Sequence, residues 1–530
     1  MFSAGGCGIV EIPSVTAEIE HPSKFIPFFT FDITLNLSMD FRRRWLIIIF
    51  LIALGVRLLP LLWAISEPKR LFSPDSHSYW RLAEELAKSG AYAVNDEPEL
   101  FRTPGYPFFL AFLMRLGVNN GVQAAFVQAI IGAASCVLLF GLVRKLMQAF
   151  PELLPANVKT AHWLPLLSAL LLAVSTVSVA AANLILSENL FTFLFLVLLF
   201  GVEKWLTWYD GAQNFQTFRG KSSAVSSTNR IRCFLSSSAD STKCILAKID
   251  WRLSALALVS GVLVLVRAIF LPLLPVFAFY LAVRSGKVKP AVLFLVIALL
   301  VPFSWSIRNL HTADYFGIAT VSDINIYRYK ACALQAHLQN RDFAEVQKEF
   351  STQLAEAGGQ REQAEFARSR GLAILSQAPG RYLLVHTRSS LNALLPDFGN
   401  LAALFGAEVG GRGTLAVLQT EGLAAGVKHY FEDNFTLAVL SIPFVGLLLT
   451  QYLGAGTAII YFLRRKHGFV IVLLFHLVLL GWLLFIPGPA SHPRFRVPAQ
   501  PIICFYGAAG LMIGLMFFKA EKKGPGKCFE

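Results

Sequence analysis

A polar stretch between two strongly apolar regions, residues 73–107, carries the side chains best suited to chemistry. It holds an acidic side chain, Asp75, and a basic side chain, Arg102. Arg102 lies shortly before a Pro-Gly-Tyr-Pro turn at 104–107. Apolar residues between them recur at helical spacing, which predicts an amphipathic helix that ends near Gly90. An acid and an arginine held by one short segment could take up a proton and stabilise a negative charge in the same reaction.

Further charged side chains lie at the edges of other apolar stretches. Glu188 follows one such stretch, Arg267 interrupts a second, and Arg57 lies inside the first. Charges in or beside membrane spans are costly and tend to mark function, and a planar guanidinium suits a phosphate held at an interface. We therefore expect the acids Asp75 and Glu188 to converge with several cations on one face of the membrane. The expected substrate- or phosphate-binding side chains are Arg57, Tyr79, Arg102, Arg267, Arg308, His492, Arg494 and Arg496.

Structural explanations compete with functional ones at these positions. Asp75 could cap the helix that starts near Ser76, and Glu188 could simply favour the N-terminus of a span. Arg102 and the basic group at 492–496 could be interfacial anchors whose stems lie along the lipid. Arginines on the outer side of a membrane run against the usual inside bias, which favours a function for them.

The composition excludes an ordinary soluble protein. Only 15% of the 530 residues are charged and 55% are hydrophobic, whereas a soluble chain carries about 25% charged residues. The expected fold is an all-α multi-pass membrane protein with about ten or more transmembrane helices, amphipathic helices in the outer loops and a small outer-face segment. Basic loops on the inner side explain the net charge of +14, so no nucleic-acid partner is expected.

Basic and apolar stretches alternate in a way that assigns each segment to a side of the membrane. Three arginines at 42–44 precede the first span, so the N-terminus is expected inside and residues 73–107 outside. Residues 253–283 are too long for one helix and are expected to form a hairpin with Arg267 at its outer turn. The expected spans are 45–64, 120–143, 161–182, the stretch from about 188 to 203, the two helices of 253–283, 290–306, 435–462, 468–486 and 499–518.

The same alternation predicts how the chain is organised. Residues 107–117 are apolar but too short to span, and 341–378 is expected to hold amphipathic helix. The expected parts are 1–38, a disordered or over-extended N-terminus before a true start at Met39; 39–309, an N-terminal transmembrane catalytic module with a first outer loop at 65–119 and a cytoplasmic loop at 204–252; 310–433, an outer-face soluble segment; 434–518, C-terminal transmembrane helices; and 519–530, a cytoplasmic tail.

Seven cysteines are spread along the chain without a Cys-x-x-Cys pair. Cys233 and Cys244 share a loop expected in the cytoplasm, where disulfides are rare, and Cys332 alone falls clearly outside. We therefore expect no structural disulfide and no metal site.

Several short motifs, taken in order, resemble one known family. They are Asp75 with Tyr79 and a Leu-Ala-x-x-Leu helix, Gly90-Ala-Tyr92, Arg102-x-Pro-Gly-Tyr-Pro107, Ser187-Glu188-Asn189, Trp305-Ser-Ile-Arg308-Asn309 and Arg494-Phe-Arg496-Val-Pro498. They resemble the polyprenyl-phosphate-sugar-dependent glycosyltransferases of the C fold, which include protein O-mannosyltransferases, lipid A aminoarabinose transferases and lipopolysaccharide galacturonosyltransferases. The resemblance covers about 45–310 and 435–518, whereas 310–433 resembles no family that we can name.

The resemblance implies that a sugar moves, with inversion, from a polyprenyl phosphate to a glycan, lipid or protein acceptor on the outer face of a membrane. Asp75 corresponds to the family's acid in the first outer loop and would be the general base, while Glu188 would orient the acceptor or the sugar. Arginines such as Arg308, Arg494 or Arg267 would stabilise the leaving phosphate. The lipid-linked sugar would be a co-substrate, with no further cofactor, and a bacterial inner membrane with the site on its periplasmic face is the expected location.

One departure from the family's pattern narrows what the resemblance implies. The protein mannosyltransferases commonly carry Asp-Glu in the first outer loop, where this chain has Asp75-Ser76. The loop also has no Asp-x-Asp, so the metal-dependent oligosaccharyltransferase branch and a catalytic metal are not expected.

Two other functions stay open. A transporter or flippase of lipid-linked sugars often shows repeat symmetry and helices broken at mid-membrane, whereas these halves show no repeat and the charges lie at the ends of spans. A surface-glycan ligase or polymerase would share the lipid-linked donor. Donor hydrolysis in detergent separates a transferase, which often leaks sugar to water, from a transporter, which does not.

Overall fold

The computed structural model describes residues 39–153, 163–222, 250–407, 414–432, 434–465 and 468–521. By its internal contacts the chain divides into two units, Met1–Arg44 and Trp45–Glu530. The second unit holds every candidate site residue. Three expectations lie outside the described residues: the N-terminal segment 1–38, the part of the inner loop at 223–249 that contains Cys233 and Cys244, and the end of the tail at 522–530.

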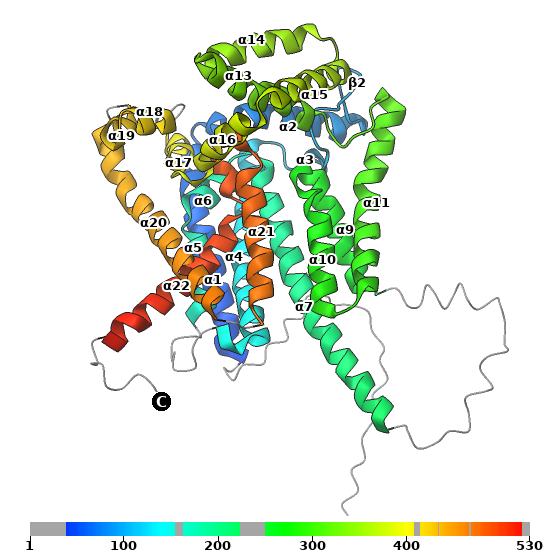
Figure 1. Cartoon of the computed structure of the whole chain (residues 1–530), viewed down its shortest axis with the longest axis vertical. Coiled ribbons are helices and arrows are strands. Elements are labelled where there is room, and N and C mark those ends of the chain that lie inside the picture. The colour runs from blue at the N-terminus through cyan, green and yellow to red at the C-terminus, as the bar shows by residue number, and fades with distance from the viewer. Residues whose placement is uncertain are drawn as a thin grey trace, which may run out of the picture. The chain divides into compact units, whose positions relative to one another are not determined.

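Long apolar helices run side by side through the second unit (Figure 1). Within the described ranges, seven helices are long and apolar enough to cross a membrane, or eight if a pair bent by 54° is one span. The chain is therefore a multi-pass membrane protein. The helices are α1 (Met39–Ala64), α4 (Gly121–Ala149), α7 (Ser187–Ser222), α10 (Leu273–Ser285) with the short turn η4 (Ala268–Phe270), α11 (Val288–Ala313), α20 (Phe435–Arg464) and α22 (Gln500–Glu521), and the bent pair is α5 (Leu164–Ala173) and α6 (Thr176–Asn183).

The expected count of ten spans is reached only when two shorter apolar helices are included. These are α9 (Trp251–Val266) and α21 (Val470–Phe485), each of 16 residues, and both lie where spans are expected from the sequence. The single span expected at 161–182 is instead the bent pair, which breaks between Ala173 and Thr176.

The helical hairpin expected at 253–283 is confirmed, and it places Arg267 at the turn. Helix α9 ends where Arg267 takes up extended backbone, with φ −149° and ψ 115°, and α10 begins after Pro272. Helix α9 packs against α7 and α11. The guanidinium of Arg267 is thereby carried to the end of two apolar helices instead of lying within one.

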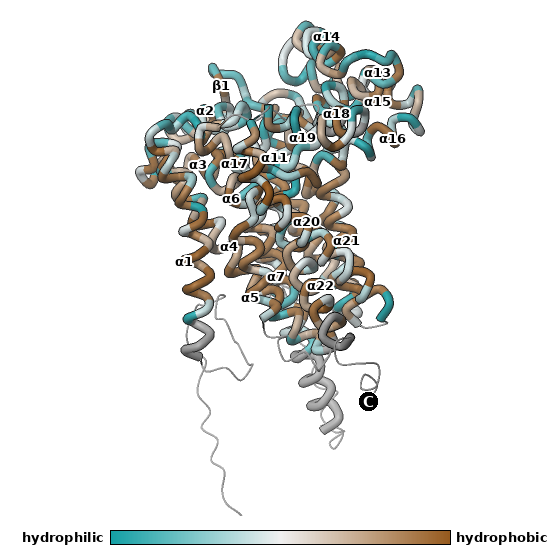
Figure 2. Tube along the Cα trace, turned by 90° about the vertical axis from the view of Figure 1, so that its left-hand side faces the viewer, coloured by the Kyte–Doolittle hydropathy of each residue, from teal (hydrophilic) through white to brown (hydrophobic). Residues whose placement is uncertain are grey.

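Shorter and more polar elements gather at one end of the long helices, which we call the α2 end (Figures 1 and 2). The first group is η1 (Pro68–Leu71), α2 (Pro74–Ser89), the antiparallel strands β1 (Ala93–Val94) and β2 (Glu97–Pro98), and α3 (Gly105–Arg115). Segment 310–433 supplies α12 (Val321–Asn325), the π-helical turn η5 (Ile326–Ala331), α13 (Cys332–Gln339), α14 (Phe343–Glu356), α15 (Gln360–Gln377), α16 (Pro379–Ser390), η6 (Leu391–Leu394), α17 (Phe398–Leu404), α18 (Thr414–Thr420) and α19 (Leu423–Phe431). The turns η7 (Gly488–Ala490) and η8 (Pro493–Arg496) follow α21 at this end, whereas η2 (Pro151–Leu153) follows α4 at the opposite end.

Helix α2 forms as its sequence predicts, except at its first residue. Ser73 is the N-cap, and it shares reciprocal hydrogen bonds with Ser76 in a capping box. The interpretation of Asp75 as the cap is therefore wrong, because a serine two residues earlier satisfies the free N–H groups and leaves the carboxylate available for other partners. Gly90 ends the helix with a left-handed backbone, φ 76°, as expected.

Helices α20 and α22 cross at small residues. A Cβ atom on Gly510 would lie 1.7 Å from the carbonyl oxygen of Gly454, so only glycine allows the two backbones to approach this closely. Because α22 begins four residues after η8 ends, this crossing also anchors the turn that precedes it.

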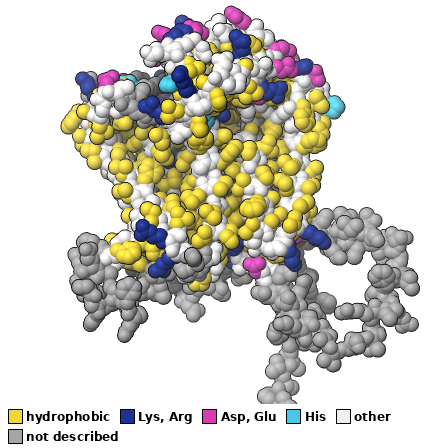
Figure 3. Space-filling model, viewed as in Figure 1, with side chains coloured by type: hydrophobic (Ala, Val, Ile, Leu, Met, Phe, Trp, Pro, Cys, Tyr) yellow, Lys and Arg dark blue, Asp and Glu magenta, His cyan; other side chains and the backbone are white. Residues whose placement is uncertain are grey.

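The surface of the unit separates into an apolar side and two charged ends. Figure 3 shows hydrophobic side chains over the flanks of the long helices, with Lys, Arg, Asp and Glu gathered at the two ends. Residues such as Leu59 on α1, Leu300 on α11 and Leu453 on α20 are more than half exposed. An apolar flank of this kind is the surface that hydrocarbon tails cover in a bilayer.

Two boundaries differ from those expected. Helix α7 continues to Ser222, so the inner loop that is expected to begin at 204 starts as helix. In segment 310–433 the amphipathic stretch 341–378 is two helices, α14 and α15, separated at Gly358, which has φ +107°.

Candidate functional site

Asp75 lies in the first turn of α2 and is held between two arginines from distant parts of the chain. Its Oδ1 accepts a hydrogen bond from Arg102 Nη2 at 2.8 Å, and its Oδ2 accepts one from Arg494 Nη2 at 2.5 Å. The side chain of Asp75 is 33% exposed. The carboxylate is thus fully paired and still open to a molecule that approaches from the α2 end.

The two arginines set the protonation state of this acid. Burial alone would raise the pKa of Asp75, but the charges of Arg494 and Arg102 and their hydrogen bonds outweigh it and hold the pKa at about 2, below its ordinary value of 3.8. Asp75 is therefore ionised at physiological pH. While both arginines stay in place it is also a weak base.

Glu188, at the start of α7, forms a second ion pair beside the first. Its Oε1 lies 2.8 Å from Arg267 Nη1 and 3.9 Å from Arg494 Nε. The side chain is only 3% exposed, and within the described part of the chain Oε2 has no hydrogen-bond partner. A buried carboxylate oxygen without a partner is costly, so this atom is an acceptor that the described residues leave unused.

Arg494 joins the two pairs into one cluster, which we call the acid–arginine cluster. It consists of Asp75, Arg102, Glu188, Arg267 and Arg494. Three guanidinium groups face two carboxylates, so the cluster has one positive charge in excess. Its members come from α2, the loop after β2, the start of α7, the turn after α9 and the turn η8, and their expected convergence is confirmed for these five side chains.

One face of α2 completes the cluster. The Arg102 guanidinium lies 4.8 Å from the centroid of the Tyr79 ring, and its Nε donates to Ser78 Oγ at 3.0 Å. Tyr79 in turn meets Tyr106 of α3 edge to face at 5.0 Å. Because residues three and four apart share a helix face, Asp75 and these two α2 side chains hold Arg102 together.

Two of the expected ligand-binding arginines are buried elsewhere. Arg57 is 1% exposed and donates to the backbone oxygens of Ala53 and Ala173, at 3.0 and 3.2 Å. Arg496 is also 1% exposed and donates to the backbone oxygens of Ala393 and Leu395, at 2.7 and 2.8 Å. Each guanidinium joins two segments of the fold, so neither is presented to a ligand at the cluster, contrary to the expectation.

Arg308 and His492 also lie outside the cluster and contact residues that support it. Arg308 Nη2 donates to the backbone oxygen of Tyr92 at 2.9 Å, and the Tyr92 hydroxyl donates to the backbone oxygen of Arg102 at 3.0 Å. His492 Nδ1 accepts a hydrogen bond from the backbone N–H of Arg494 at 3.2 Å, which caps the turn η8. Direct binding of substrate by these two residues stays a prediction.

Sequence reasoning missed the side chains that hold the Arg102 loop. Glu99 Oε1 accepts hydrogen bonds from the backbone N–H groups of Phe101 and Arg102, at 2.8 and 2.9 Å. Side chains that fold back onto the backbone in this way are typically Asp and Asn, so a glutamate at position 99 was not a specific signal. Gln360, which holds the same loop from α15, had no local signal either.

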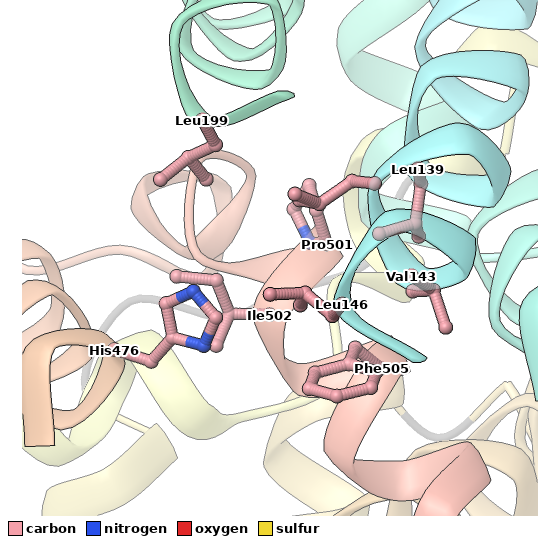
Figure 4. Close-up of a pocket in the computed structure, with 9 residues that line it drawn as sticks. Leu139, Val143, Leu146, Leu199, His476, Pro501, Ile502 and Phe505 are labelled. Carbon is pink, nitrogen blue, oxygen red and sulfur yellow. The ribbon is translucent and has the colours of Figure 1, made fainter. Parts of the chain in front are cut away.

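A pocket lined by residues of α4, α7, α21 and α22 lies apart from the cluster and offers no comparable chemistry (Figure 4). It is lined by Leu139, Leu142, Val143, Leu146, Leu199, His476, Pro501, Ile502 and Phe505. The His476 Nδ1 atom lies 3.0 Å from the Tyr506 hydroxyl, so the one polar residue of that lining already has a partner. Among the described residues there is also no group of three or more His, Cys, Asp or Glu side chains that could hold a metal ion.

No family model matches the chain, and no curated protein matches it. Among solved structures, the oligosaccharyltransferase of Archaeoglobus fulgidus tethered to an acceptor peptide with the NVT sequon aligns over 92% of this chain and 51% of its own, with 13% identity and a TM-score of 0.47. The archaeal oligosaccharyltransferase AglB from the same organism, in complex with an inhibitory peptide and a dolichol-phosphate, aligns over 92% of this chain and 53% of its own, with 14% identity and a TM-score of 0.42.

This chain therefore spans about half the length of the two proteins it is similar to. At these identities and TM-scores the likeness identifies neither a family nor an activity. What the site can do has to be derived from its own residues.

Proposed function

We propose that the chain is an inverting glycosyltransferase that moves a sugar from a polyprenyl-phosphate donor to the hydroxyl group of an acceptor at the α2 end. The observation that supports this most is the acid–arginine cluster, with its partly exposed carboxylate and its excess of one positive charge. The motifs around Asp75, Glu188 and Arg494 resemble those of C-fold glycosyltransferases, which supports the same conclusion.

The charge of the cluster matches the charge of the proposed donor. A sugar joined to a polyprenyl phosphate is a phosphodiester and carries one negative charge, whereas a diphosphate-linked sugar carries at least two. The side chains of Arg102, Arg267 and Arg494 are 14%, 20% and 24% exposed, so each can be reached by a phosphate oxygen. Guanidinium groups bind phosphate oxygens through paired hydrogen bonds. The five side chains and a monophosphate donor together carry no net charge, and Glu99 beside Arg102 adds one further negative charge nearby.

Asp75 is the proposed general base. The acceptor hydroxyl attacks the anomeric carbon and gives its proton to the Asp75 carboxylate, while the bond between that carbon and the phosphate oxygen breaks and its electrons stay with the phosphate. Inversion requires the carboxylate and the leaving phosphate on opposite faces of the sugar. Protonation of Asp75 raises the excess charge of the cluster by one, and the leaving polyprenyl phosphate gains one negative charge in the same step.

The weak basicity of free Asp75 fits this role when donor binding is included. A donor phosphate that takes hydrogen bonds from Arg494 and Arg102 draws them away from the carboxylate, and its own charge lies close by. Both effects raise the pKa of Asp75, and so does its burial. Asp75 therefore becomes an effective base only after the donor has bound.

Glu188 has a different role from Asp75, because its surroundings differ. It is almost fully buried and stays paired with Arg267 at 2.8 Å, while its Oε2 is left free to accept a hydrogen bond. We assign it to the orientation of a sugar hydroxyl and to the placement of Arg267 and Arg494. In this scheme the arginines stabilise the leaving phosphate with the positive charge that a metal ion supplies in metal-dependent enzymes. Turnover is therefore expected to persist in the presence of a chelator.

The membrane face follows from the positive-inside rule. Lys145, Arg284 and Arg464 lie near the C-terminal ends of α4, α10 and α20, which are the ends away from α2, and the rule assigns ends with such basic residues to the cytoplasm. The site is then on the outer face, which is the periplasmic face if the protein resides in a bacterial inner membrane.

The test uses the purified protein in liposomes with radiolabelled polyprenyl-phosphate sugars and an envelope extract as acceptor. The proposal predicts that label moves to an acceptor, and that the product names the sugar and the acceptor class. A chelator should leave the rate unchanged. Label that only crosses the bilayer would indicate a transporter, and activity that a chelator abolishes and manganese restores would contradict the metal-free scheme.

A further inference from the structure

The loop that carries Arg102 is held by hydrogen bonds to its backbone from two side chains. Glu99 Oε1 accepts from Phe101 N and Arg102 N, at 2.8 and 2.9 Å. Gln360 Oε1 accepts from Leu100 N and Phe101 N, at 2.8 and 2.9 Å. The backbone N–H groups of three consecutive residues, Leu100, Phe101 and Arg102, therefore donate to one carboxylate and one amide.

The two side chains also contact one another. Gln360 Nε2 donates to Glu99 Oε2 at 3.5 Å, a long hydrogen bond. Glu99 is 7% exposed. Only an amide can accept from the loop with its oxygen and donate to a carboxylate with its nitrogen at the same time. A carboxylate at position 360 would instead place two negative charges side by side.

Gln360 belongs to segment 310–433, and further contacts fasten that segment to the same loop. It is the first residue of α15, and the backbone N–H of Thr320 donates to the backbone oxygen of Leu100 at 2.8 Å. The Leu100 side chain packs in a small apolar cluster with Tyr315 and Ala364. The segment is thus joined to the backbone that leads directly into the acid–arginine cluster.

We infer that Gln360, together with Glu99, is a positioning residue. Through it, segment 310–433 fixes the backbone at Arg102 so that the guanidinium of Arg102 contacts Asp75. The inference rests on the proposed function only for its link to the donor phosphate. Gln360 touches neither the carboxylate of Asp75 nor the guanidinium of Arg102. It acts by fixing the backbone from which that guanidinium extends, so its loss weakens donor binding and does not remove the base.

The experiment compares Gln360→Met with Gln363→Met in the full chain, reconstituted in lipid nanodiscs. Methionine keeps the length of the side chain and removes the amide. Gln363 is the matched control, because it lies one turn along α15 and its amide donates only to the backbone oxygen of Gly358, at 2.8 Å. Two readouts are taken: the affinity for a fluorescent polyprenyl phosphate, and the hydrogen–deuterium exchange of residues 99–102.

Gln360→Met is expected to weaken polyprenyl-phosphate binding about tenfold, whereas Gln363→Met binds as the wild type does. In the Arg102→Ala background the Gln360→Met change should have little further effect, because both changes then remove the same interaction. Exchange at 100–102 should become faster in Gln360→Met alone. A merely structural role would lower the melting temperature without this dependence on Arg102.

The two readouts separate failure of the inference from failure of the proposed function. If no variant, wild type included, binds polyprenyl phosphate, the proposed donor is wrong, and faster exchange at 100–102 in Gln360→Met still supports the positioning role. Unchanged exchange and unchanged affinity in Gln360→Met overturn the inference. If that variant does not fold, Leu100→Ala, which removes the packing on Tyr315 and Ala364, is expected to give the same loss of affinity and must do so for the inference to stand.

Discussion

Two acid–arginine groups lie on the same helix, α7, and differ in the number of their ion-paired side chains and in exposure. Glu188 begins the helix and belongs to the cluster around Asp75. Glu203 lies about 22 Å further along the axis, where its Oε1 accepts a hydrogen bond from Tyr280 and its Oε2 lies 3.5 Å from Arg284. The Arg284 guanidinium also donates to the Tyr280 hydroxyl at 2.6 Å and lies 4.9 Å from the Phe150 ring centroid.

The group at Glu203 is closed, and the group at Asp75 is not. At Glu203 one arginine is ion-paired with one acid, and the side chains of Arg284 and Glu203 are 14% and 6% exposed. The charge of Lys145 also acts on this acid. The cluster at the α2 end has three arginines on two acids and a carboxylate that is 33% exposed. Within the described residues, a buried carboxylate oxygen without a hydrogen bond occurs in both groups, at Glu188 Oε2 and at Glu203 Oε2, and does not distinguish them. An ion pair inside a membrane protein is thus not by itself a sign of function. Excess charge with access from one end is the feature that indicates a ligand.

Loss of Arg494 should have the largest effect on donor handling. Arg494→Ala removes the side chain that joins the two acids, and a charged hydrogen bond contributes about 1.5–3 kcal/mol, so donor affinity should fall roughly 10- to 100-fold. Arg284→Ala removes an arginine from the closed group and is the control. It should leave donor affinity unchanged, as measured by binding of a fluorescent polyprenyl phosphate. Equal losses in both variants would contradict the distinction between the two groups.

The same substitution should change the pH dependence of transfer. In the wild type the pKa of Asp75 in the folded protein is below its ordinary value. The ion pairs of Asp75 therefore stabilise the fold at any pH above the pKa of Asp75 in the unfolded chain, and this stabilisation is lost as the pH falls toward about 2. With Arg494 gone, burial is less opposed and the pKa rises. The acid limb of kcat/KM, which reports the free enzyme, should therefore move to higher pH in Arg494→Ala. An unchanged limb would mean that Asp75 is not the base.

A smaller effect is expected from Gly105→Ala, which disturbs the cluster without touching it. A Cβ atom at Gly105 would lie 2.6 Å from the backbone nitrogen of Val266, directly beside Arg267. Thr103 Oγ1 also donates to the Val266 oxygen at 3.0 Å. The loop with Arg102 should be pushed away from the turn with Arg267. The loss of transfer should stay below the roughly 100-fold that a shift of a full 1 Å can cause. Gly446→Ala, where a Cβ meets nothing within 4 Å, is the control.

The smallest effect on transfer is expected at the closed group. Glu203→Gln keeps an acceptor for the Tyr280 hydroxyl and leaves the Arg284 charge without its acid, which destabilises the fold by on the order of 3 kcal/mol. Thermal unfolding in detergent should show a lower Tm, while kcat and donor affinity stay those of the wild type. A loss of transfer at an unchanged Tm would show that this group belongs to the reaction.

Much of the fold could be predicted because it depends on local patterns. Apolar stretches of about 20 residues gave the spans, and Gly90 gave the end of α2. Basic residues on both sides of 253–283 place both ends of that stretch on the inner side, which predicts the hairpin with Arg267 at its turn. The bend between α5 and α6 and the length of α7 could not be predicted in the same way, because helical sequence continues through both.

The site could be predicted only in part, because a charge pattern does not reveal which partner a side chain finds. Asp75, Glu188 and three arginines were placed together from their positions at span ends. Arg496 lies two residues from Arg494, at the same span end. Its guanidinium nevertheless donates to the backbone oxygens of Ala393 and Leu395, in and directly after η6. Gln360 carried no signal, because its contacts with the Arg102 loop depend on how segment 310–433 folds back.

Asp75→Asn tests the central claim most directly, with donor binding and sugar transfer measured on the same preparation. The amide keeps the shape of the side chain and removes the charge that competes with the donor phosphate. Transfer should fall by roughly 10²–10⁴-fold, while polyprenyl-phosphate binding is kept or becomes tighter. A variant that transfers sugar as the wild type does, or that loses donor binding and transfer together, would contradict the assignment of Asp75 as a general base that its arginines keep weakly basic until the donor binds.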